Sequence, residues 1–126
     1  MANKILVVDD EPPILRLMEF ILAREGHEMI VAVNGEEALA KVAEHSPDLI
    51  LLDIMMPRID GYEVVRRLRA DPAHGKIPII MLSAKAQDAD VQKGVDVGVN
   101  EYITKPFSPP YLVEVVNKYL GPQDAG

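Results

Sequence analysis

The chain has 126 residues, of which 48% are hydrophobic, enough to bury the core of one domain. Its net charge of −7 makes it a poor candidate for binding nucleic acid through its own surface. It contains no cysteine, which excludes disulfides, thiolate metal sites and thiol nucleophiles. No apolar run approaches the roughly 18 residues of a membrane span, and the start of the chain does not resemble a signal peptide. We therefore expect a cytoplasmic protein without membrane contact.

Apolar segments at five places along the chain predict strands: residues 5–8, 28–33, 49–52, 78–82 and 101–104. The first and third are unbroken aliphatic runs, which are typical of strands buried on both faces of a parallel sheet. Helical patterns fill the intervals, so the sequence predicts a doubly wound α/β domain with five parallel strands and five helices. We expect this domain to span residues 1–121, with 122–126 as a disordered tail or the start of a linker.

Start and stop signals delimit the predicted helices. Pro12 and Pro13 suit the first turn of a helix that ends at Gly26. A weaker helix over residues 88–97 contains Gly94, which lowers helix propensity by about 1 kcal/mol relative to alanine. Capping residues mark three other helix starts: Asn34 with Glu37, Asp60 with Glu63, and Ser108 followed by Pro109.

Several charged residues have an ordinary structural interpretation. Arg66, Arg67 and Arg69 on the third helix are predicted to point outward, and a solvated helix face is a more common meaning of such a run than a docking patch. The three histidines are far from the predicted strand ends and are interpreted as surface residues: His27, His45 and His74.

The predicted strand ends carry the chemistry. Asp9 and Asp10 follow the first strand, Asp53 follows the third, Ser83 the fourth and Lys105 the fifth. On its own, an aspartate in this position is as readily a cap of the following turn as a functional group. Because parallel strands end at the same edge of a sheet, and ligands bind at that edge in open α/β sheets, we expect these side chains to meet.

Three carboxylates, a hydroxyl and an ammonium at one edge suggest phosphoryl transfer. The carboxylates repel one another, and a hard cation such as Mg²⁺ offsets that repulsion. Cationic groups and a hydroxyl donor neutralise and position a phosphoryl group, and a carboxylate can itself act as the nucleophile. The residues therefore predict Mg²⁺-dependent phosphoryl transfer onto Asp53.

Four motifs in this order resemble the response-regulator receiver domain, the flavodoxin-like module of bacterial two-component signalling. They occupy residues 7–11 (VVDDE), 52–61 (LDIMMPRIDG), 82–84 (LSA) and 102–107 (YITKPF). The resemblance extends over residues 4–120. It implies a chemotaxis-regulator-like domain with the strand order 2-1-3-4-5.

The resemblance also implies the roles of the acidic residues. Asp53 matches the phosphoacceptor. Asp10 and Asp53, with the backbone carbonyl of Met55, match direct ligands of Mg²⁺, and Asp9 would act mainly through a bound water. Mn²⁺ is expected to substitute for Mg²⁺.

The remaining site residues match a switch. By resemblance, Lys105 would contact the phosphoryl oxygens, Ser83 would move to donate a hydrogen bond to the phosphoryl group, and Tyr102 would swing inward behind it. The residues alone leave an alternative for Tyr102, a core aromatic with a solvated hydroxyl. The family reports its state through a face that corresponds here to residues 88–120.

Partners follow from the same resemblance. The donor would be a sensor histidine kinase or a phosphotransfer protein, and the recipient of the signal a downstream effector or an attached output domain. The domain would be a phosphoacceptor signalling domain rather than an enzyme, and would catalyse only its own phosphorylation and dephosphorylation. The resemblance also allows a phosphorylation-dependent homodimer. The sequence does not establish it, because the last helix offers Glu114 and Lys118 for ion pairs between subunits but no arginine.

Two alternative functions use similar residues. A phosphatase of the haloacid-dehalogenase type places a second aspartate two residues after its nucleophile as an acid/base, and this chain has Met55 there. A degenerate receiver that acts only as an interaction module would not need the complete set of strand-end groups. Met55 also offers no polar group to orient an attacking water, so we expect a long-lived phosphorylated state.

Overall fold

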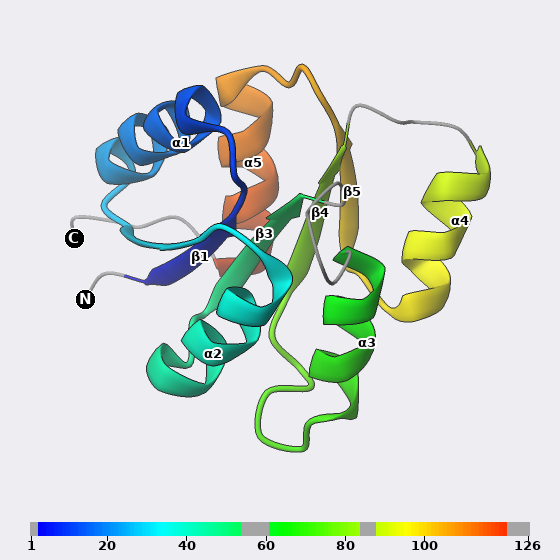
Figure 1. Ribbon diagram of the computed structural model, residues 1–126. Coiled ribbons are helices and arrows are strands. Elements are labelled where there is room, and N and C mark those ends of the chain that lie inside the picture. The colour runs from blue at the N-terminus through cyan, green and yellow to red at the C-terminus, as the bar shows by residue number, and fades with distance from the viewer. Residues whose placement is uncertain (1–2, 54–60, 84–87, 121–126) are drawn as a thin grey trace.

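The computed structural model describes residues 3–53, 61–83 and 88–120, without the side chains of 88–91 and 94, and five strands alternate with five helices within these ranges. The strands are β1 (Lys4–Val8), β2 (Glu28–Ala32), β3 (Leu49–Asp53), β4 (Ile79–Ser83) and β5 (Glu101–Thr104). They form one sheet in the order β2-β1-β3-β4-β5, and all neighbours are parallel (Figure 1). The doubly wound fold and the strand order predicted from the sequence are confirmed.

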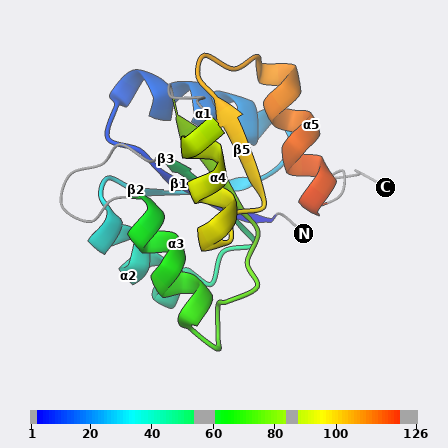
Figure 2. The ribbon, with the colours of Figure 1, turned by 90° about the vertical axis from the view of Figure 1, so that its right-hand side faces the viewer.

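Helices cover both faces of this sheet (Figures 1 and 2). They are α1 (Pro12–Arg24), α2 (Gly35–His45), α3 (Gly61–Ala70), α4 (Asp88–Val97) and α5 (Pro109–Leu120). The first and last pack on one face, while α2 and α3 pack on the other, with α4 beside α3. No helix among the described residues has the length and apolar character needed to cross a membrane.

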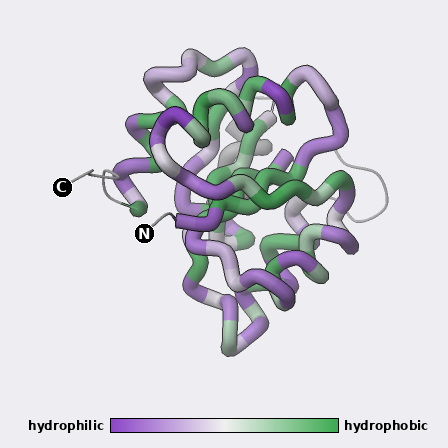
Figure 3. Tube along the Cα trace, turned by 90° about the vertical axis from the view of Figure 1, so that its left-hand side faces the viewer, coloured by the Kyte–Doolittle hydropathy of each residue, from purple (hydrophilic) through white to green (hydrophobic). Residues whose placement is uncertain are grey.

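The alternation of side chains along the central strands supplies both halves of the core. In β1, Leu6 and Val8 face the helices α2 and α3, while Ile5 and Val7 face α1 and α5. Every residue of β3 is buried, as expected for a central parallel strand covered on both sides. The apolar residues accordingly gather at the sheet in the middle of the molecule (Figure 3).

Local signals set the helix ends where the structure describes them. Asn34 caps α2 by accepting a hydrogen bond from the Glu37 N–H at 2.8 Å, as predicted. The Ser108 hydroxyl likewise accepts from the Tyr111 N–H at the start of α5. Gly26, with φ of 82°, ends the first helix in a backbone conformation that favours glycine. The predicted Asp60 cap and the predicted tail at 122–126 lie outside the described residues.

The prediction for the third arginine of α3 was wrong. Arg66 and Arg67 are exposed, and both pair with Glu63 of the same helix, consistent with a solvated face. Arg69 is half-buried instead and donates hydrogen bonds across to the segments before β4 and β5, including Gly98 O at 2.9 Å. Its position near the end of α3 brings it against a turn 29 residues further along the chain.

The prediction that all three histidines lie at the surface was also wrong. His45 and His74 are partly exposed, but His27 is buried, with 7% of its surface exposed. The turn between α1 and β2 folds His27 inward, and its N–H donates to Leu22 O. Neither ring nitrogen of His27 has a hydrogen-bond partner among the described residues. Burial lowers the pKa of His27 below its ordinary value, although the charge of Glu25 acts in the opposite direction.

We predict that His27 makes the protein less stable in mild acid. Because its pKa is lower in the folded state, the unfolded chain binds the proton more readily, and stability falls as the pH drops below the unfolded-state value of about 6.5. In thermal unfolding followed by circular dichroism at pH 7.5 and pH 5.5, about one unit either side of that value, His27→Leu should lose less stability on acidification than the wild type. The partly exposed control His45→Gln should behave as the wild type, and equal losses in all three proteins would contradict the prediction.

Candidate functional site at the carboxyl edge of the sheet

The predicted site residues follow four neighbouring strands. Asp9 comes directly after β1, Asp53 ends β3, Ser83 ends β4 and Lys105 comes directly after β5. These strands are consecutive in the sheet, so their ends lie side by side at one edge. The Lys105 N–H donates to Ser83 O at 2.7 Å, which continues the β4–β5 ladder by one residue into the site.

Three carboxylates converge at this edge. Asp9, Asp10 and Asp53 each offer an oxygen within 4.8 Å of the others. Asp9 and Asp53 are nearly buried, whereas Asp10 is exposed to solvent. The Glu11 N–H donates to Asp9 Oδ1 at 2.9 Å and fixes the orientation of that carboxylate.

Lys105 supplies a positive charge to the carboxylates. Its Nζ lies 3.0 Å from Asp9 Oδ2, 3.4 Å from Asp53 Oδ2 and 3.6 Å from Glu11 Oε1. Burial opposes the charged ammonium, but the hydrogen bond to Asp9 and the charges of Asp53, Asp9 and Glu11 outweigh burial and raise the pKa of Lys105. The lysine is therefore charged at neutral pH and offsets part of the repulsion among the carboxylates.

The donor set fits a hard divalent cation. The three side chains offer carboxylate oxygens, the ligands that Mg²⁺ takes in proteins. Oxygens on opposite sides of a Mg²⁺ ion are about 4.2 Å apart, which is compatible with carboxylate oxygens that all lie within 4.8 Å of one another. The exposed Asp10 leaves the cluster open to solvent on one side, which suits an ion that keeps several of its waters.

Other predicted site residues differ in what the structure shows of them. Ser83 is nearly buried, and Thr104 is its partner on the neighbouring strand. Tyr102 is half-buried on β5 and packs against the apolar cluster under α2 and α3. The backbone carbonyl of Met55 lies outside the described residues. Sequence reasoning missed Glu11 as a partner of Lys105, although the run of three acidic residues after β1 was the signal.

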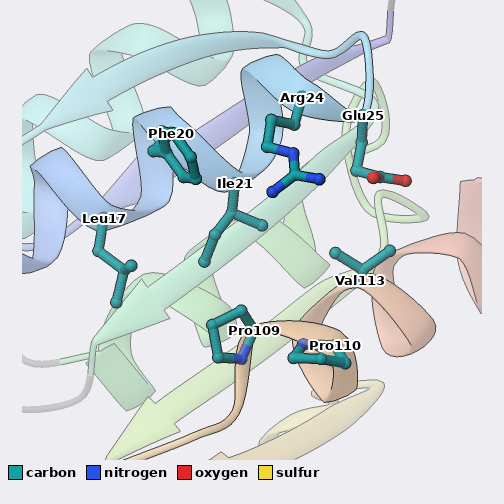
Figure 4. A pocket seen from close by; sticks show the side chains of 8 residues that line it. All are labelled: Leu17, Phe20, Ile21, Arg24, Glu25, Pro109, Pro110 and Val113. Carbon is teal, nitrogen blue, oxygen red and sulfur yellow. The ribbon is translucent and has the colours of Figure 1, made fainter.

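A hollow of about 470 Å³ lies elsewhere, between α1 and α5 (Figure 4). Phe20 and Ile21 of α1 face Pro109 and Pro110 of α5 across it. None of the strand-end groups lines this hollow, and its mainly apolar wall does not suit phosphoryl chemistry. The strand-end cluster remains the candidate site.

Comparison with known proteins decides the family. The model of the response regulator receiver domain matches residues 5–117. The chain belongs to the response regulator receiver domain family. It is 48% identical over 109 residues to the alkaline phosphatase synthesis transcriptional regulatory protein PhoP of Bacillus subtilis, covering 86% of this chain and 45% of that protein. The chain spans about half the length of the curated relatives it matches.

Solved receiver-type structures agree with this assignment. A response regulator from Chloroflexus aurantiacus has a TM-score of 0.91 and 35% identity, covering 95% of this chain and 98% of that one. The receiver domain of a sensor histidine kinase from Pseudomonas aeruginosa, solved with a magnesium ion coordinated in its active-site cleft, has a TM-score of 0.88 and 30% identity, covering 96% and 99%. This receiver domain is thus a response-regulator module of two-component signalling.

We predict that the receiver domain depends on Lys105 for stability when no metal is present. Lys105→Met leaves the nearly buried Asp9 and Asp53 carboxylates without this counter-ion, so the free energy of unfolding should fall by about 3 kcal/mol. Urea unfolding at pH 7 with a chelator measures the loss. Because a dication supplies the missing positive charge, added Mg²⁺ should stabilise the variant more than the wild type.

The control for this prediction is Lys118→Met. Lys118 pairs with Glu101, but its side chain is largely exposed and solvent screens the pair, so its loss should lower the free energy of unfolding much less than the loss of Lys105. Equal losses in the two variants would show that the strand-end carboxylates do not need Lys105.

Proposed function

We propose that Asp53 accepts a phosphoryl group from the phosphohistidine of a sensor histidine kinase or a phosphotransfer protein. A carboxylate oxygen of Asp53 bonds to phosphorus as the bond from phosphorus to the imidazole nitrogen breaks, and the released imidazole takes a proton. The position of Asp53 carries this proposal: it is nearly buried, with two other carboxylates and the Lys105 ammonium beside it.

The proposed reaction needs a divalent cation. Asp10 and Asp53 would hold Mg²⁺ directly, together with the backbone carbonyl of Met55, and Asp9 would act mainly through a water. When bound, the cation neutralises charge on the phosphoryl oxygens. The oxygen donors of the cluster support this assignment, and Mn²⁺ is expected to substitute because it prefers the same ligands.

Three side chains would recognise and report the phosphoryl group. Lys105, held charged beside Asp53, would donate to the phosphoryl oxygens once they arrive. Ser83, at the neighbouring strand end, would move to donate its hydroxyl to the same group. Tyr102, two strand positions before Thr104 on β5, would turn inward and alter the output face formed by α4, β5 and α5.

The proposed chemistry is restricted to the domain itself. The domain would catalyse its own phosphorylation and dephosphorylation in the cytoplasm and act on no other substrate. Asp9 and Asp53 converge with Asp10 in one cluster of carboxylates, which suits a domain that accepts a phosphoryl group better than one that serves only as an interaction module. The position two residues after Asp53 is Met55, which lacks the acid/base group of a haloacid-dehalogenase phosphatase.

The signal would pass to a downstream effector or to an output domain attached after the receiver domain at residues 1–121. A relative is named as a transcriptional regulatory protein, and it is about twice as long as this chain. A phosphorylation-dependent homodimer through the output face is a further outcome, but there Lys118 already pairs with Glu101 within the chain. A dimer contact that uses Lys118 would have to break this pair.

Intact mass after incubation with acetyl phosphate tests the proposed function. We expect a single phosphoryl adduct in the wild type that needs Mg²⁺ and disappears in Asp53→Ala, because that variant lacks the acceptor oxygen. The exposed Asp48→Asn is the matched control and should be phosphorylated as the wild type is. No adduct under any condition would favour an interaction module, and release of free phosphate without a lasting adduct would favour a phosphatase.

We further predict a long-lived phosphorylated state. The methionine side chain at position 55 has no hydrogen-bond donor and only a weakly accepting sulfur, so it is poorly suited to orient a water that would attack the phosphoryl group. The adduct should therefore persist well beyond seconds after the acetyl phosphate is removed, and Met55→Asn should shorten its lifetime. Decay within seconds in the wild type, followed by intact mass over time, would contradict this prediction.

A further inference from the structure

Arg69 binds two segments, the loop before β4 and the turn before β5, at the edge of the sheet opposite the acidic cluster. Its Nε donates to Gly98 O at 2.9 Å. One terminal nitrogen donates to Gly75 O at 3.1 Å and Ile77 O at 2.7 Å, and the other donates to Asn100 Oδ1 at 2.8 Å. We call Arg69 with these four acceptors the Arg69 clamp.

The acceptors of the Arg69 clamp favour one rigid arrangement of the guanidinium. All four acceptors are neutral oxygens, three from the backbone and one from a side-chain amide. A planar guanidinium binds several acceptors in one fixed geometry. Because Arg69 is half-buried, leaving this position would cost it the hydrogen bonds to these acceptors, which stabilises the arrangement. The acceptors lie at the opposite end of β4 from the acidic site, so a metal or a phosphoryl group bound at that site would not contact them.

Asn100 extends the clamp to the two edge strands. Its Oδ1 also accepts from the Ile79 N–H at 2.8 Å, and its own N–H donates to Ile79 O at 2.8 Å. The hydroxyl of Tyr119 on α5 donates to Asn100 O at 3.0 Å. The start of β4, the turn before β5 and the last helix are therefore connected to Arg69 through Asn100.

Gly98 shows how closely the turn after α4 approaches the guanidinium. Its φ of 105° is one that side chains rarely adopt. A Cβ at this position would lie 3.3 Å from both Cγ and Nε of Arg69. Both the backbone conformation at position 98 and the short distance to Arg69 therefore favour glycine there.

The carboxyl end of α4 also packs on the core, since Val97 lies against the apolar cluster under α3. Lys93 lies over the ring of Tyr62 at 4.4 Å, but it belongs to the part of α4 that precedes this end. Figures 1 and 2 show α3, α4 and β5 next to one another. Four strand steps, about 13 Å, separate Ile79 at the clamp from Ser83 at the acidic site.

We propose that the Arg69 clamp is the fixed pivot of the output face. It holds the carboxyl end of α4 and the starts of β4 and β5 in one position in both signalling states. Movement that follows phosphorylation is then confined to the first two turns of α4 and the site-proximal ends of the two strands. This inference rests on the proposed phosphorylation of Asp53, and it assigns Arg69 a positioning role rather than a chemical one.

Hydrogen exchange with mass spectrometry tests the pivot on the full chain, before and after treatment with acetyl phosphate and Mg²⁺. In the wild type, phosphorylation should change exchange across residues 88–93 several-fold and leave 95–101 nearly unchanged. In unphosphorylated Arg69→Gln, the amides of Ile79, Gly98 and Asn100 should exchange about tenfold faster, as expected from the loss of a hydrogen bond to a charged group. In phosphorylated Arg69→Gln, the change should spread into 95–101.

Arg66→Gln is the matched control, since Arg66 is an exposed arginine on the same helix, and it should exchange as the wild type does. If Arg69→Gln does not fold, Gly98→Ala disturbs the same contact from the other side and should spread the change in the same way.

Intact mass of each sample reports the adduct independently of exchange. An adduct with equal changes at 88–93 and 95–101, or a clamp variant without faster exchange, would overturn the pivot alone. An absent adduct would overturn the proposed function and the pivot with it.

Discussion

The carboxyl edge of the sheet depends on one charge interaction, the contact of the Lys105 ammonium with the carboxylates of Asp9 and Asp53. Two nearly buried carboxylates this close repel each other, and burial increases the cost of keeping both ionised. Lys105 lies 3.0 and 3.4 Å from them and offsets part of that cost. One ammonium does not balance three carboxylates, and the uncompensated negative charge supports the proposed binding of a dication at this edge.

The two edges of the sheet are built from different interactions. At the carboxyl edge, opposite charges can be rearranged by a metal or a phosphoryl group. At the other edge, Arg69 binds neutral oxygens that neither ligand contacts. Strand β4 joins the two, since it begins beside Asn100 and ends at Ser83. In the proposed switch, Ser83 would therefore move relative to a start of β4 that Asn100 and Arg69 hold in place.

Family membership and site geometry restrict the function in different ways. The match over residues 5–117 establishes a receiver domain of two-component signalling, whereas the strand-end residues suggest what that domain does chemically. The proposed acceptor, carboxylate ligands, hydroxyl donor and lysine together belong to four adjacent strand ends, those of β1, β3, β4 and β5.

The fold and the residues of the acidic cluster could be predicted from the sequence alone. Each motif follows a predicted strand, and parallel strands end at one edge, so Asp53 and Lys105 were expected to meet despite a separation of 52 residues. Which polar residues are buried depends instead on tertiary packing. Arg66 and Arg69 are the same residue type on one helix, and His27 follows a helix stop typical of the surface. Their burial depends on which distant segment packs against them. The periodicity of apolar residues along the chain predicts helices and strands but not such long-range contacts.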